Sequence, residues 1–161
     1  MNHEGLCPFS WVTILYRKMA DRMHWFKESL ELATDGKGLY PINDLVNQRL
    51  QGWELHEGMC FLYMPHTSAS LVISESFDPS ARMDVEAFFE RLAPENQPWY
   101  RHTLEGADDS PSHIRATLTQ VSLSIPVERG QLAMGTWQGV FLFEHRAGRY
   151  RRRVEMRGLK I

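Results

Sequence analysis

The stretch Gly58-Met-Cys-Phe-Leu-Tyr-Met-Pro-His-Thr-Ser-Ala-Ser-Leu-Val-Ile-Ser74 determines the fold that we expect. Residues 58–64 and 69–74 are two apolar runs of strand length, and residues 65–68 are a short polar connection between them. Apolar runs of this length predict core strands. Strands joined by a tight connection pair in antiparallel fashion. The stretch therefore predicts an antiparallel sheet at the centre of the domain.

Other segments also have the pattern of strands. Residues 121–127 alternate apolar and polar side chains, which predicts a half-buried strand, and residues 140–144 form another apolar run. Two further strands are predicted at 24–34, before the turn Asp35–Gly38, and at 149–157, after Gly148. At least six strands are therefore expected.

Three helices are predicted between these strands. Residues 41–50 have a helical apolar period, which predicts a face packed on a sheet. Asp78 is expected to cap a helix that runs to about Leu92. Its expected apolar stripe consists of Met83, Ala87, Phe88 and Leu92. Ser110-Pro111 begins a short third helix with His113 in its first turn. The expected fold class is α+β, mainly an antiparallel, jelly-roll-like β-sandwich with about three inserted helices.

Length and composition restrict the kind of protein. The chain has 161 residues, enough for one domain with its own core. No regular pattern holds over residues 1–22, so we predict a poorly ordered N-terminal extension there and a single domain over 23–161. The net charge of −2 and the lack of a long apolar run give no reason to expect nucleic-acid or membrane binding. Cys7 and Cys60 differ in context, so no disulfide is expected and the reducing cytoplasm is the predicted location.

A polar segment, residues 100–115, is the first candidate for a functional site. It combines two histidines, three carboxylates and two arginines with little apolar content. One interpretation is a site where histidines and carboxylates converge on a metal or an anionic substrate. The other is an exposed, charged loop that leads into a helix. The segment alone does not decide between them.

Three histidines stand in polar surroundings near the ends of predicted elements: His66, His102 and His113. Three neutral imidazoles suit zinc or another first-row divalent ion and leave a position open for water or substrate. Each of them alone is more often a hydrogen-bonded histidine than a ligand. We predict a shared metal site from the set, although their spacing is not that of a known short motif. His24, His56 and His145 are interpreted as structural.

Carboxylates near these histidines are candidates for catalysis. Asp109 is predicted to orient an imidazole or to act as a general base, and the alternative is that it caps the third helix. Glu75 and Glu144 each end an apolar strand, and such a carboxylate faces either solvent or a site. We favour a site for Glu75, because His66, Thr67 and Ser68 belong to the same strand region. Thr67 and Ser68 are predicted to bind substrate.

The segment Gly135-Thr-Trp-Gln-Gly139 has a glycine at each end, which allows close approach of the backbone. Trp137 can stack on a planar ring and Gln138 can hydrogen-bond the edge of a heterocycle, so both are predicted to bind substrate. The alternative is a strand bend with a core tryptophan. The arginines of 149–153 are interpreted either as the charged protection of an edge strand or as a phosphate clamp.

Several of these motifs together resemble the YjbQ-like family, also called the secondary thiamine-phosphate synthase family. The motifs are His66-Thr-Ser-Ala-Ser70, Glu75, Gly106-Ala-Asp-Asp-Ser-Pro-Ser-His113-Ile114 and Gly135-Thr-Trp-Gln-Gly139. The resemblance covers the chain from about His24 to its end, in the same order. It implies a compact β-sandwich with helices that assembles as a homotrimer, with sites near the subunit boundaries.

The resemblance also implies an activity and its site. The activity is the joining of a pyrimidine methyl pyrophosphate to a thiazole phosphate with loss of pyrophosphate, as a secondary activity. The implied pocket surrounds His66, His102 and His113 and holds a divalent metal, zinc or magnesium, or an anion. Catalytic roles are expected for Glu75, Asp109 and His113. Two alternatives stay open: metal-assisted hydrolysis of a small phosphorylated metabolite, and a trimeric module that binds a metabolite without catalysis.

Overall fold

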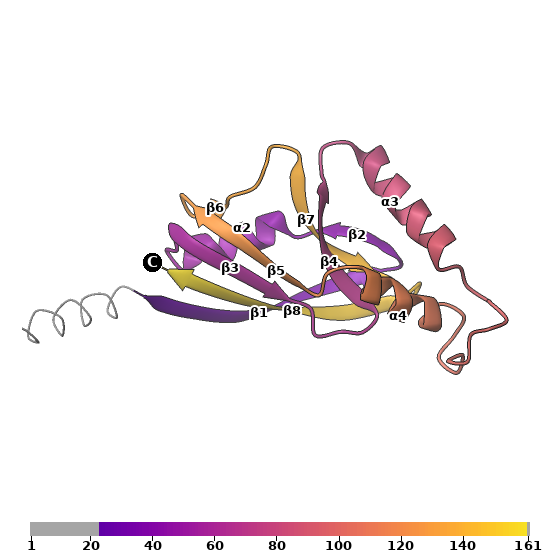
Figure 1. Cartoon of the computed structure of the whole chain (residues 1–161). Coiled ribbons are helices and arrows are strands. Elements are labelled where there is room, and N and C mark those ends of the chain that lie inside the picture. Colours follow the sequence, from indigo (N-terminus) through magenta and orange to yellow (C-terminus); the bar gives the residue numbers. More distant parts are fainter. Residues whose placement is uncertain (1–22, 161) are drawn as a thin grey trace, which may run out of the picture.

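The computed structural model describes residues 23–160, so the prediction for residues 1–22 lies outside the described part of the chain. Over the described residues the fold is α+β, with three helices and antiparallel sheets, as predicted (Figure 1). The strands are β1 (His24–Asp35), β2 (Gly38–Pro41), β3 (Glu57–Tyr63), β4 (Ala69–Glu75), β5 (Ser122–Glu128), β6 (Gln131–Leu132), β7 (Gln138–Glu144) and β8 (Arg149–Lys160). The helices are α2 (Asn43–Gly52), α3 (Pro79–Leu92) and α4 (Asp109–Leu118).

The strands form two sheets. One has five strands in the order β1-β8-β3-β5-β6, and the other has three in the order β2-β7-β4. Within the described residues, all named strand pairs are antiparallel. The two apolar runs of residues 58–74 are thus β3 and β4, but they belong to different sheets. Their connection, residues 64–68, passes from one sheet to the other.

One apolar core serves both sheets. Cys60 and Leu62 of β3 are buried in the same cluster as Leu71 of β4 and Leu142 of β7. The helix α2 adds its apolar face to this cluster, as the helical period predicted. The core therefore fixes the connection at 64–68 from both sides, because each flanking strand is anchored in it.

The basic strand β8 is not an edge strand, so that interpretation of its arginines was wrong. It pairs with β1 over its full length and with β3 over its second half. Its side chains alternate between faces, and this places Arg152 inside while Arg151 and Arg153 are exposed. Gly58 allows the close approach of β3 and β8, because a Cβ atom there would lie 1.9 Å from the carbonyl oxygen of Leu159.

The helix α3 begins as predicted but uses a different face. The Asp78 side chain accepts a hydrogen bond from Ser80 N and caps the helix. The side chains that pack against the small apolar cluster of Leu39, Phe141 and Phe143 are Val85 and Phe89. The expected stripe is instead largely exposed: Met83 at 60%, Phe88 at 59% and Leu92 at 50%. The predicted stripe is therefore not the face that packs on the sheet, because an apolar period does not say which surface it meets.

Within residues 23–160, the structure holds no helix with the length and apolar character that a membrane span requires.

Candidate metal centre

Three of the predicted site residues meet at the start of α4. Asp109 is the first residue of the helix, and His113 follows one turn later on the same face. His102 reaches the same point from the loop that precedes the helix. The Nε2 atom of His102 lies 2.7 Å from Asp109 Oδ2, and Nε2 of His113 lies 3.5 Å from Asp109 Oδ1. The ligand atoms of all three residues lie within 4.8 Å of one another.

The His113 ring is held in a form that can bind a metal. Its Nδ1 atom lies 2.8 Å from the carbonyl oxygen of Thr67. A carbonyl oxygen only accepts hydrogen bonds, so Nδ1 carries the proton and donates it. The lone pair of a neutral ring is therefore on Nε2, which faces Asp109. A ligand histidine that donates its other ring N–H to a carbonyl is the usual arrangement at metal sites.

Asp109 carries the strongest indication that this cluster can bind a cation. Its side chain is 1% exposed, and Oδ2 has no hydrogen-bond donor among the described residues. The nearby His102 Nε2 lies 2.7 Å away without forming a hydrogen bond to this oxygen. A buried carboxylate oxygen without a partner costs free energy. A divalent ion between Asp109 and the two imidazoles would remove this cost.

The other oxygen of Asp109 is occupied by Arg146, which also binds the neighbouring Asp108. Arg146 Nη1 contacts Asp109 Oδ1, and Arg146 Nε donates to Asp108 Oδ2 at 3.0 Å. Burial alone would raise the pKa of Asp108, but hydrogen bonds from Ala147 N and Arg146 lower it. The helix cap residue is Asp108, without a side-chain cap bond, so the capping role considered for Asp109 is not seen.

His66 lies near this cluster but is engaged elsewhere. Its Nε2 atom accepts a hydrogen bond of 2.9 Å from Arg153 N. Burial lowers the pKa of His66, and the charges of Arg152 and Arg153 lower it further, so the ring is neutral at pH 7 with its proton on Nδ1. In this arrangement neither nitrogen offers a free lone pair to a metal. The ring instead contributes to the pocket beside the metal centre.

That pocket has a volume of about 660 Å³ and joins two of the predicted histidines. It lies between the 64–68 connection and α4. Its lining consists of Tyr63, Met64, Pro65, His66, Thr67, His113, Ala116, Thr117 and Val121. A volume of this size accommodates a small heterocyclic molecule. Ser68 is turned toward Arg152, whose Nη2 group donates to its Oγ at 3.1 Å and to its carbonyl oxygen.

The remaining predicted residues lie at the other end of β4. Glu75 ends this strand and pairs with Gln138, whereas Ala69 at its start pairs with Glu144. About 20 Å of extended chain separates the two ends. Glu75 accepts hydrogen bonds from Phe77 N and Asp78 N, and the Gln138 side chain accepts one from Gly135 N. Within one chain these residues do not reach the metal centre.

Trp137 is 58% exposed, so the alternative of a core tryptophan was wrong. Its ring meets that of Phe77, itself 74% exposed, edge to face at 4.9 Å. Two aromatic side chains that bury each other only in part form an apolar surface that is available for contact.

Sequence reasoning missed a buried polar network that supports the metal centre. Glu144 is fully buried and receives hydrogen bonds from Arg152, from Thr34 and from the backbone of Arg146. His145, treated as structural, is buried and bonds to Ser70. The signal was the polar sequence Glu144-His-Arg146 directly after an apolar strand. His145 Nδ1 has no partner within the described residues, so Ser70 and His145 do not form a catalytic triad.

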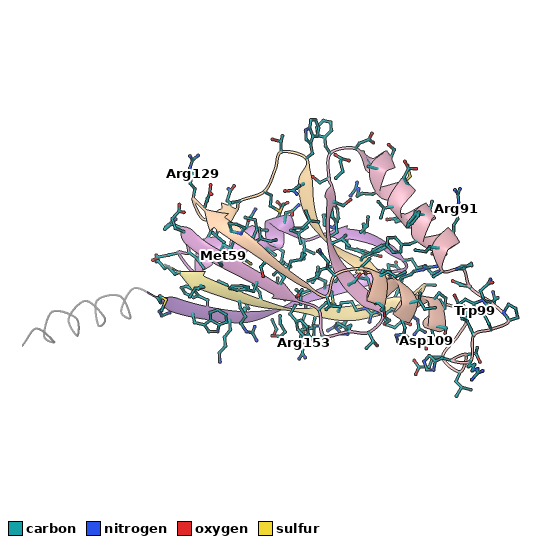
Figure 2. All side chains as sticks on the ribbon, viewed as in Figure 1. Met59, Arg91, Trp99, Asp109, Arg129 and Arg153 are labelled. Carbon is teal, nitrogen blue, oxygen red and sulfur yellow. The ribbon has the colours of Figure 1, made fainter. Side chains whose placement is uncertain are left out.

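All parts of this centre lie at one end of the molecule. Figure 2 labels Asp109 at the end that carries α4, and Met59 of β3 toward the opposite end. The residues come from the 100–108 loop, α4, the 64–68 connection and the β7–β8 turn. The chemistry of the set, two imidazoles and a carboxylate, matches zinc and other first-row divalent ions better than magnesium, which prefers oxygen ligands.

Comparison with known proteins finds relatives over most of the chain. A relative from Synechocystis, named as a UPF0047 protein, is 45% identical over 128 residues, which cover 80% of this chain and 87% of the relative. The UPF0047 protein YjbQ of Escherichia coli O157:H7 is 40% identical over 131 residues, or 81% of this chain and 94% of that protein.

Solved structures share the fold. A conserved hypothetical protein from Thermus thermophilus matches with a TM-score of 0.73 at 36% identity, over 80% of this chain and 97% of that one. A YbjQ-like protein of unknown function from Sulfolobus solfataricus matches with a TM-score of 0.78 at 24% identity, over 86% and 99% of the two chains. The family described as UPF0047 protein YjbQ-like matches residues 28–160. The chain belongs to this YjbQ-like family, as its motifs predicted.

Proposed function

We propose that this chain is a metal-dependent enzyme that acts on a small phosphorylated molecule at His102, Asp109 and His113. The observation that supports it is the buried Oδ2 of Asp109, which lies beside two imidazoles and has no hydrogen-bond donor within residues 23–160. The proposed reaction is the one that the resemblance implies, a thiamine-phosphate synthase-like transfer. The C–O bond of a pyrimidine methyl pyrophosphate breaks, pyrophosphate leaves with the electron pair, and the ring nitrogen of a thiazole phosphate forms the new C–N bond.

The residues of the centre suit the loss of an anionic leaving group. A bound zinc ion, or magnesium as the second candidate, would neutralise charge on the pyrophosphate. His102, Asp109 and His113 would hold it, and the Thr67 carbonyl keeps the His113 ring oriented through Nδ1. The adjoining pocket, with Thr67 and His66 in its wall, is the proposed place of the heterocycle.

We propose further that the complete enzyme is a homotrimer of β-sandwich subunits. Shared burial of side chains from both sheets supports the sandwich. The exposed apolar stripe of α3 and the exposed Phe77–Trp137 pair support self-association. In such a trimer, Glu75, Trp137 and Gln138 of one subunit would orient and stack on a pyrimidine bound at the metal centre of the next. In this assembly Glu75, Trp137 and Gln138 could contact substrate, as the sequence predicted.

Hydrolysis is the second candidate. His102 is 56% exposed, so the metal centre is accessible to water. Three protein ligands leave room for a bound water, whose pKa such an ion lowers to ~7. A phosphorylated metabolite in the neighbouring pocket would then be the substrate of a metal-assisted hydrolase.

The metal centre is tested by titrating metal-free protein with Zn²⁺ in a calorimeter. The unmodified protein is expected to bind one ion per chain. His102→Ala and His113→Ala are expected to weaken binding by at least about 100-fold, since each removes a ligand. His24→Ala, on exposed β1, is the matched control and should bind as the unmodified protein does. Equal Zn²⁺ affinity in all four proteins would show that His102 and His113 are not metal ligands and would refute the proposed metal centre.

The reaction is tested by supplying both thiamine precursors, and then each one alone. Product that requires both precursors and an intact His113 supports the transferase. Release of phosphate from one precursor alone supports the hydrolase instead. Tight binding without turnover of either would leave the third function considered above, a non-catalytic binding module, and would overturn both enzyme proposals.

A further inference from the structure

We propose that Arg146 is a positioning residue of the metal centre, which sets how Asp109 binds the ion and holds the loop that delivers His102. This inference rests on the metal part of the proposed function. Arg146 follows β7 and is 8% exposed. Neither the periodicity of the sequence nor its motifs pointed to it.

All three nitrogen atoms of the Arg146 guanidinium group contact one segment of the chain, residues 105–109. Nε donates to Asp108 Oδ2 at 3.0 Å, Nη1 contacts Asp109 Oδ1, and Nη2 donates to the carbonyl oxygen of Glu105 at 2.8 Å. The planar fork of an arginine can make these three contacts at once, whereas the single ammonium group of a lysine cannot reproduce their geometry.

The contact with Oδ1 determines the role of Asp109. Because the positive charge of Arg146 lies against Oδ1, Oδ2 is the better placed of the two oxygens to bind a cation. Oδ2 is the atom that lies 2.7 Å from His102 Nε2 and has no hydrogen-bond donor among the described residues. Arg146 therefore makes Asp109 a ligand through one oxygen and directs that oxygen toward His102.

The other two contacts hold the loop. Residues 101–107 are exposed, and few other bonds attach this segment to the body of the protein. Arg146 fixes it at Glu105 and Asp108, and Asp108 also accepts a bond of 2.8 Å from Ala147 N. Arg146 is itself tied to the core, since its backbone N–H donates to the buried Glu144 at 3.1 Å. His102 is thereby held near Asp109 before any ion binds.

The test is a double-mutant cycle on Zn²⁺ affinity with Arg146→Met, Asp109→Asn and the double variant. Arg146→Met is expected to weaken Zn²⁺ binding about 10- to 100-fold, the range for residues that orient ligands. Because Arg146 acts in part through Asp109, the double variant is expected to lose less Zn²⁺ affinity than the sum of the losses in the two single variants. Arg149→Met is the control, because Arg149 is 83% exposed and pairs with Asp35 at the surface.

Replacing Zn²⁺ with Co²⁺ allows the visible spectrum of the bound metal to be measured, and this spectrum would not change if Arg146 had a merely structural role. The visible spectrum of the Co²⁺ form is expected to differ between the unmodified protein and Arg146→Met, because the carboxylate ligand is altered. If Arg146→Met does not fold, Arg146→Lys replaces it and is expected to show the same spectral change. Additive losses in the cycle, or an unchanged spectrum, would overturn the role of Arg146. Absence of Zn²⁺ binding by the unmodified protein would instead overturn the metal centre.

Discussion

Burial lowers the pKa of His145 to about 3, and the charges of Arg115 and Arg152 lower it as well. The unfolded chain, with an ordinary histidine pKa near 6.5, therefore binds a proton more readily than the folded protein does. The contribution of the neutral ring to stability is complete above about pH 6.5. It declines as the pH falls from there toward 3, by about 1.4 kcal/mol for each pH unit.

This predicts a measurable effect of His145→Gln. Glutamine can still bond to Ser70 but does not titrate. The free energy of unfolding, measured with urea from pH 7 to pH 4, should fall less steeply with acid in His145→Gln than in the unmodified protein. His56→Gln, at an exposed position, is the control and should keep the original slope. Parallel curves for His145→Gln and the unmodified protein would show that this ring does not carry the acid sensitivity.

Residue types alone identified the three side chains of the candidate metal centre. His102, Asp109 and His113 were found because several imidazoles and carboxylates in polar segments near element ends form, as a set, the pattern of a metal site. Arg146 was not found, because an arginine after a strand resembles any surface arginine until its partners are known. Glu75 was placed wrongly relative to His66 within one chain, because opposite ends of a strand are close in sequence but far apart in space.

At the scale of elements, α3 shows what periodicity can and cannot predict. The helix and its Asp78 cap were predicted, because both depend on local chemistry. The face of α3 that packs on the sheets of this chain was not predicted, because α3 has apolar residues on two sides. Val85 and Phe89 meet the small core cluster, while Met83, Phe88 and Leu92 remain exposed. The strands β3, β4 and β5 were predicted well, but the division into two sheets depends on long-range pairing.

The two faces of α3 predict opposite results for neighbouring phenylalanines. Phe88→Asp is expected to change the free energy of unfolding of the single chain by less than about 0.5 kcal/mol, but to dissociate the proposed trimer. Phe89→Ala is expected to cost about 2 kcal/mol, because Phe89 packs edge to face on Phe143 at 5.2 Å. Sedimentation velocity and urea unfolding measure the two effects. A Phe88→Asp protein that sediments like the unmodified one would exclude this stripe as the contact surface.

At the scale of the whole molecule, the separation of the two groups of site residues predicts complementation between subunits. His113→Ala and Trp137→Ala are each expected to be inactive alone. When the two are co-expressed in equal amounts, about a quarter of the interfaces in a cyclic assembly join an intact His113 to an intact Trp137. Turnover of both thiamine precursors should return to about that fraction. Mixed assemblies as inactive as the single variants would place the complete site within one chain.

The position of β8 has a consequence for how the protein is made. The last described strand, β8, lies between β1, the first described strand, and β3. The larger sheet can therefore close only after β8 has been synthesised. Products of premature termination would present the unsatisfied backbone of β1 and β3 to other chains, a condition that leads to aggregation.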